Sequence, residues 1–255
     1  DGVDPTPLDV TDAAAAAAER VDTDELAAVD RAAENIRAFH EAQRPEDWRE
    51  EFDGRELGRR FRPLERVGVY VPGGGAAYPS SALMGVIPAV VAGVSEVAVV
   101  TPPAEDLDPL TLAAIDRAGA DEVYQAGGAQ AVAALAYGTD TIPAVQKVVG
   151  PGNRWVTAAK AEVRGDVAID FLAGPSELLV VADGDADPAY VAADLLAQAE
   201  HDANASVVAV TPDPDLADSV VEVVADRLPE RARADTARAA LEGDASGVFV
   251  ADSMA

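Results

Sequence analysis

Gln198 and His201 lie three positions apart in the segment DLLAQAEHDANA, residues 194–205. On an α-helix, Asp194, Gln198 and His201 would share one face, because positions i, i+4 and i+7 lie above one another. A carboxamide oxygen and an imidazole nitrogen can both bind zinc, but zinc takes three or four protein ligands, so this pair is at most half a set. The spacing alone leaves a zinc site and a solvent-facing helix end open. The other histidine, His40, closes an apolar helical stripe and is interpreted as a packing or capping residue.

Three glycine-rich turns suggest a second kind of chemistry. They are PGGG (72–75), AGGAQA (126–131) and GPGN (150–153). Each follows a strand-like segment and precedes a helical one, the place where helix N-terminal N–H groups bind phosphate in open parallel sheets. None completes the G-x-G-x-x-G pattern, and glycine at such a turn is often only a steric requirement. An anionic ligand and a purely structural role therefore remain equally open.

The elements that must position these residues follow a regular alternation. From residue 67 onward, short Val-rich segments alternate with helical segments, which is typical of βαβ units. The sequence predicts two doubly wound, Rossmann-like parallel-sheet α/β domains with an N-terminal helical segment. Asp187 and Pro188 fit the N-cap and first position of one of the helices.

The expected domains have these boundaries. Residues 1–60 form the N-terminal helical segment, which we expect to pack with the second α/β unit. Residues 61–175 form an α/β nucleotide-binding domain, and residues 176–255 begin a second α/β domain that carries the zinc and substrate residues. The division is placed near Gly174 and Pro175, and the charged stretch RPEDWREEFDGRELGRR (44–60) is interpreted as a connector.

Composition restricts the class of protein. The formal charge of -27 excludes nucleic-acid binding, which needs Lys and Arg to displace phosphate counterions. Acidic residues are spread along the chain rather than gathered in a tail, so we interpret them as a surface adapted to high salt, not as a site for a basic partner. There are no cysteines, hence no disulfide and no thiolate. The longest apolar segment, 82–94, is too short to span a bilayer, and the sequence predicts a cytoplasmic protein with no membrane association.

Several long motifs together resemble the histidinol dehydrogenase family. They are RVGVYVPGGGAAYPSSALMGVIPA, GGAQAVAALAYGTDTIPAVQKVVGPGN, AIDFLAGPSE and DLLAQAEHD, and NIRAFHEAQ is similar to that family's N-terminal helix. The resemblance runs from about residue 24 to the end of the sequence.

The resemblance implies NAD-dependent oxidation of L-histidinol to L-histidine through the aldehyde, in histidine biosynthesis, with NAD and Zn2+ as cofactors and a homodimer as the assembly. It also implies roles for six residues. NAD would contact Tyr70, Gln130 and Asn153; the substrate would contact Ser176, Gln198 and His201; and zinc would be bound by Gln198 and His201.

The family's catalytic Glu-His pair, in a Pro-Glu-His motif, and its other two zinc ligands would lie beyond Ala255. We therefore expect the chain to be a fragment without the proton-transfer base, inactive alone, and assign no catalytic residue. Without cysteine, a thiohemiacetal mechanism is excluded, whereas oxidation of an aldehyde hydrate needs only a base and a hydride acceptor. A non-catalytic nucleotide-binding module is the alternative function, and an acidic scaffold for a basic partner is a third.

Overall fold

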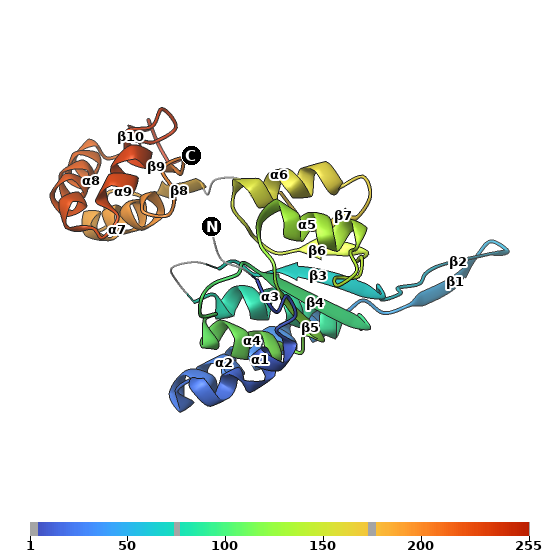
Figure 1. Cartoon of the computed structure of the whole chain (residues 1–255). Helices are drawn as coiled ribbons and strands as arrows, with labels where there is room; N and C mark the ends of the chain where they lie inside the picture. Colours follow the sequence, from blue (N-terminus) through green and yellow to red (C-terminus); the bar gives the residue numbers. More distant parts are fainter. Residues whose placement is uncertain (1–4, 74–76, 173–176, 255) are drawn as a thin grey trace. The chain divides into compact units, whose positions relative to one another are not determined.

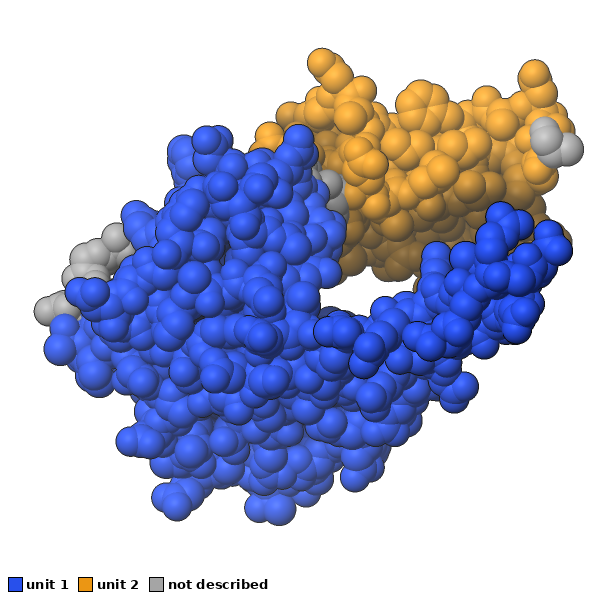
Figure 2. Space-filling model, turned by 90° about the vertical axis from the view of Figure 1, so that its right-hand side faces the viewer, with its two compact units in different colours: residues 1–172 blue, residues 173–255 orange. Residues whose placement is uncertain are grey.

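The computed structural model describes residues 5–73, 77–172 and 177–254. The chain divides into two compact units, residues 1–172 and residues 173–255, coloured separately in Figure 2. The division falls after Leu172, and the predicted boundary residues Gly174 and Pro175 lie outside the described residues. Each unit is described by itself below.

Unit 1 is built on a five-stranded parallel sheet with the order β5-β4-β3-β6-β7. The strands are β3 (Arg66–Tyr70), β4 (Glu96–Thr101), β5 (Glu122–Gln125), β6 (Lys147–Val149) and β7 (Ala168–Ile169). The chain first adds strands on one side of β3 and then on the other. The carboxyl ends of β3 and β6 therefore flank a topological switch point, where open α/β sheets bind ligands.

Helices cover both faces of this sheet (Figure 1). They are α3 (Pro79–Val91) and α4 (Pro109–Ala118) on one face, and α5 (Gly128–Tyr137) and α6 (Arg154–Val163) on the other. All five residues of β3 are buried, as expected for a parallel strand covered on both sides. The predicted doubly wound α/β class is confirmed for this unit. Within the described ranges, no helix is long and apolar enough to cross a membrane.

The N-terminal helices belong to unit 1, and the expectation that they pack with the second α/β unit stays a prediction. They are α1 (Thr11–Ala16), the 3-10 helix Ala17–Arg20 and α2 (Thr23–Gln43). Val29 and Ala33 of α2 are buried in the same core as α3 and α4. The N–H of Val10 donates to the carbonyl of Val123 at 2.8 Å, which fixes this segment beside β5. The apolar stripe was predicted correctly, but a stripe does not specify which surface it covers.

The stretch 44–60 is not a plain connector. It forms an antiparallel hairpin of β1 (Trp48–Phe52) and β2 (Arg55–Arg59), which projects from the body of unit 1 (Figure 1). Asp53 and Gly54 form its two-residue turn, with φ of 50° and 75°. Asp-Gly is the preferred sequence for a hairpin turn that needs two positive φ angles. The sequence signal was therefore present among the charges.

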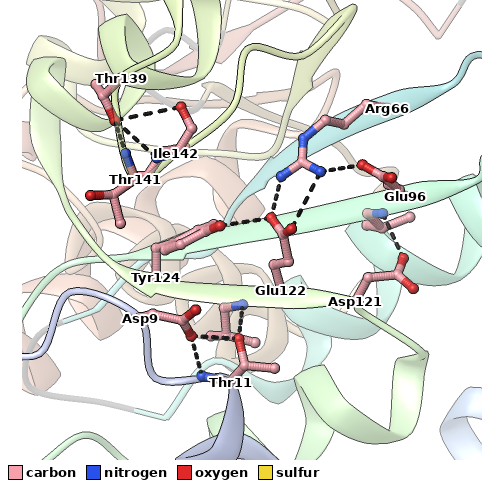
Figure 3. A network of polar contacts seen from close by, with 12 residues as sticks. Asp9, Thr11, Arg66, Glu96, Asp121, Glu122, Tyr124, Thr139, Thr141 and Ile142 are labelled. Atoms are coloured by element: carbon pink, nitrogen blue, oxygen red, sulfur yellow. Dashed lines mark hydrogen bonds and ion pairs between the residues drawn. The ribbon is translucent and has the colours of Figure 1, made fainter.

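A buried arginine joins the amino ends of three strands (Figure 3). The guanidinium of Arg66, the first residue of β3, pairs with Glu96 and Glu122, the first residues of β4 and β5. Burial lowers the pKa of Arg66, but its bonds to Glu122 and Glu96 outweigh that effect and raise it. The Tyr124 hydroxyl donates to Glu122 at 2.7 Å. Burial, followed by this bond, raises the pKa of Tyr124 to about 12.

Unit 2 contains a three-stranded parallel sheet of order β10-β9-β8. Its elements are β8 (Glu177–Val181), α7 (Pro188–Ala199), β9 (Ser206–Thr211), α8 (Pro214–Arg227), a 3-10 helix (Leu228–Glu230), α9 (Ala234–Leu241) and β10 (Gly247–Val250). The Asp187 carboxylate accepts from the N–H of Ala189, so the predicted N-cap and the Pro188 start of α7 are confirmed. The helices bury one face of the sheet, while Leu179 and Val181 of the other face are exposed.

Candidate functional site

The three glycine turns meet at the carboxyl edge of the unit 1 sheet, around Pro102 and Tyr70. A Cβ on Gly73 would lie 3.2 Å from Pro102 Cδ, and a Cβ on Gly127 would lie 2.8 Å from Pro102 Cα. Gly73 of the first turn and Gly127 of the second therefore both lie against the residue that follows β4, while Gly74 and Gly75 lie outside the described residues. The third turn reaches the same place, because a Cβ on Gly150 would overlap the backbone of Tyr70. The sheet thus brings together turns that are more than 70 residues apart in the sequence.

Tyr70 links two of these turns at the end of β3. Its hydroxyl accepts the N–H of Gly128 at 3.0 Å, at the start of α5. The side chain is buried, and burial raises its pKa although the Gly128 N–H acts in the opposite direction. Among the described residues, the hydroxyl proton of Tyr70 has no acceptor. Tyr70 therefore supports the second turn, and its expected contact with NAD stays a prediction.

Asn153 and Gln130 lie at the starts of the two helices that follow the other turns. The Asn153 carboxamide oxygen caps α6, accepting the N–H groups of Trp155 at 3.0 Å and Val156 at 3.2 Å. In the described part of the chain its carboxamide nitrogen makes no hydrogen bond. Gln130 is exposed in the first turn of α5. Both predicted residues therefore stand at helix N-termini, whose partial positive charge favours an anion.

The third turn is held by an ion pair that sequence reasoning missed. Gly150 has a φ of 108°. Its N–H donates to Asp170 Oδ2 at 2.8 Å, and its carbonyl accepts from Lys160 Nζ at 3.0 Å. Lys160 also pairs with Asp170 Oδ1 and is only 2% exposed. The only available signal was that Lys160 is one of two lysines in a chain whose other cations are arginines.

A groove of about 1260 Å³ opens on the face of the sheet that α6 leaves uncovered. Lys147 and Val149 of β6 line it, and Met84 and Pro88 of α3 form one wall. It exists because the helix between β6 and β7 packs on the opposite face. Gly150 also lines it, so the groove reaches the third turn.

Gln198 and His201 lie at the end of α7 in unit 2. The helix ends at Ala199, and His201 lies in the turn that follows it. The turn nevertheless continues, since the His201 N–H donates to the Gln198 carbonyl at 3.1 Å. The next residue, Asp202, has its pKa lowered first by the backbone N–H of Asn204 and then by the Asn204 side chain. Ser176, the remaining predicted substrate contact, lies outside the described residues.

These two side chains fit part of a zinc site. Gln198 Nε2 is buried and has no hydrogen-bond partner, and His201 is exposed with no hydrogen bond to its ring in the described chain. A half-turn of the carboxamide exchanges its oxygen and nitrogen, which places a metal-binding oxygen at that buried position. No cluster of three or more His, Cys, Asp or Glu among the described residues could hold a metal ion. The assignment of Gln198 and His201 as zinc ligands stays a prediction, and the two would be part of a larger set.

The sequence as a whole matches one family. The family described as histidinol dehydrogenase matches residues 1–255. The chain belongs to the histidinol dehydrogenase family. It is 70% identical over 247 residues to the histidinol dehydrogenase of Haloarcula marismortui, covering 97% of this chain and 58% of that protein. It is also 70% identical over 255 residues to that of Halobacterium salinarum, covering 100% of this chain and 60% of the relative.

A solved member of the histidinol dehydrogenase family has the same fold. The crystal structure of histidinol dehydrogenase from Elizabethkingia anophelis superposes with a TM-score of 0.90 at 40% sequence identity. The match covers 98% of this chain and 58% of that one. The chain thus spans about three fifths of the length of the proteins it matches. The first two relatives come from halophilic archaea, which supports the interpretation of the acidic composition as an adaptation to salt.

Proposed function

We propose that this chain forms the dinucleotide-binding part and half of the zinc site of an NAD-dependent enzyme that oxidises L-histidinol to L-histidine through the aldehyde. The observation that carries the proposal is the meeting of three glycine turns around Pro102 and Tyr70, at the ligand-binding edge of a sheet in a chain of this family. When bound, NAD+ accepts a hydride in each oxidation, and zinc holds the substrate in place.

The residues of unit 1 would bind and orient the dinucleotide. The N-termini of α5 and α6 would direct their partial positive charges toward a pyrophosphate. Asn153 keeps its carboxamide nitrogen free to donate while its oxygen caps α6. Tyr70 can donate its hydroxyl proton, because the Gly128 N–H already occupies the hydroxyl as an acceptor. Gln130 stands one turn into α5 and can reach the same ligand.

The residues of unit 2 would position the substrate. Gln198 and His201 would hold the zinc ion together with ligands from the part of the family sequence beyond residue 255, and Ser176 would contact the substrate. Fixing the alcohol carbon relative to the nicotinamide is a positioning role that lowers the entropic part of the barrier. The proton-transfer base is expected from the family's Glu-His pair, so no residue of this chain is assigned that step.

The activity is tested on the full-length protein at high salt with L-histidinol and NAD+. We expect formation of about two NADH for each histidinol consumed, since the alcohol is oxidised to the acid. NAD+ binding without any NADH formation in the metal-loaded protein would instead favour the non-catalytic nucleotide-binding module.

The zinc assignment is tested separately by metal content. In the full-length protein His201→Ala should lose most of its zinc, because an imidazole ligand is removed. His40→Ala is the matched control, since His40 is the chain's other histidine and lies in α2 of unit 1. Equal zinc in the two variants, measured by atomic emission after dialysis, would refute the assignment.

A further inference from the structure

The contacts of Lys160 assign a role to a residue pair that the proposed function leaves unused. Lys160 lies two turns into α6, and Asp170 directly follows β7. Neither was selected as a site residue from the sequence. Together they bind both backbone polar groups of Gly150: Asp170 accepts its N–H, and Lys160 donates to its carbonyl oxygen.

The Lys160 ammonium group has contacts on three sides. One hydrogen goes to Asp170 Oδ1, and one goes to the Gly150 carbonyl at 3.0 Å. The third side faces the ring of Phe171, with Nζ 5.2 Å from its centroid. An ammonium group suits this arrangement, because its three donors diverge from a single nitrogen, whereas a guanidinium holds its donors in one plane on three nitrogens.

This ion pair lies where it can act on ligand binding. Gly150 lies three residues before Asn153, which caps α6. The Lys160–Asp170 pair therefore links the Gly150 turn to α6 and to the end of β7. A buried charge pair contributes little to stability compared with apolar residues of the same size. What it does supply is a single geometry for the backbone that it binds.

We propose that Lys160 and Asp170 are positioning residues for the dinucleotide: they lock the Gly150 turn so that Asn153 and the N-terminus of α6 face the ligand. This inference rests on the proposed function, because it takes NAD+ as the ligand of that turn. It does not give either residue a contact with the cofactor.

The test uses the full-length protein with Lys160→Met and, as the matched control, Arg164→Met. Arg164 is an exposed cation directly after α6 and forms no ion pair among the described residues. We expect Lys160→Met to weaken NAD+ binding about tenfold by calorimetry, because the Gly150 turn loses the charge-assisted contact that holds it. The KM for NAD+ should rise with it, while zinc content and the KM for histidinol stay within about twofold of the parent values. Arg164→Met should change none of these quantities.

Asp170→Asn is the second variant, used because the loss of Lys160 could also impair folding. Its carboxamide keeps an oxygen for Lys160 but loses the acceptor of the Gly150 N–H, so amide exchange in 150–153 should accelerate in the folded protein. Unchanged NAD+ affinity in both variants would overturn the proposal while leaving the proposed function intact. A fall in Tm with equal losses of NAD+ and histidinol binding would reduce the pair to a structural role and overturn it as well. A parent protein that does not bind NAD+ would overturn the proposed function and this inference together.

Discussion

Gly150→Ala is the substitution with the most clearly defined steric consequence in this structure. The glycine has a φ of 108°, a conformation that costs a side-chain-bearing residue about 1–2 kcal/mol. Its added Cβ would overlap the Tyr70 carbonyl oxygen and lie 3.1 Å from the Tyr70 nitrogen. Because those atoms belong to a buried central strand, they cannot move aside, and overpacking of this kind adds about 1–3 kcal/mol. We therefore expect a loss of about 2–5 kcal/mol in the free energy of unfolding.

Gly165→Ala is the control for this prediction. No heavy atom lies within 4 Å of a Cβ at Gly165, and its φ falls outside the left-handed range. Its replacement should change the free energy of unfolding by no more than about 0.5 kcal/mol, or raise it slightly by restricting the unfolded chain. Both variants are compared with the parent by denaturant unfolding at one fixed salt concentration. A Gly150→Ala protein as stable as Gly165→Ala would refute the reasoning about the third turn.

Two further predictions concern the network at the amino ends of the strands. Tyr124 has a folded pKa of about 12 against about 10 when unfolded, so its share of stability is complete below pH 10 and is lost as the pH rises toward 12. Between pH 10 and 12 the free energy of unfolding of Tyr124→Phe should therefore fall by up to about 2 kcal/mol less than that of the parent. The same dependence of this free energy on pH in both proteins would contradict the assignment. Arg66→Met leaves Glu96 and Glu122 without their cation and should cost about 2 kcal/mol, less than a fully buried pair because both carboxylates are partly exposed. Adding Glu122→Gln should recover part of that loss in denaturant unfolding, and no recovery would show that charge is not the cause.

The alternation of strands and helices could be predicted because its signals are local. A buried parallel strand requires a short apolar segment, and a helix start requires a cap such as Asp187 followed by Pro188. The three glycine turns were found for the same reason, since each follows a strand directly. The α/β class needed no information about distant contacts.

Other features depend on contacts between segments that are far apart in the sequence, or carry no apolar pattern. The apolar stripe of α2 marked a buried face, yet only the structure shows that it packs in unit 1. The hairpin at 48–59 was hidden because every position in both strands is exposed, so no apolar alternation marks it. There the Asp53-Gly54 pair was the usable signal, and the density of charged residues obscured it.

The two edges of the unit 1 sheet show why the ligand site needed both kinds of information. Each edge contains a low-exposure cation, Arg66 at the amino ends and Lys160 at the carboxyl ends. Arg66 binds only side chains, Glu96 and Glu122, and so joins strands to one another. Lys160 binds a backbone carbonyl in the turn that follows β6. Because Lys160 binds a turn at the switch point, it can affect how a ligand is bound. Arg66 joins the first residues of strands, so its expected effect is on stability. The glycine turn can be recognised in the sequence. Lys160, which binds the Gly150 carbonyl, lies 10 residues later in α6, and only the structure shows this contact.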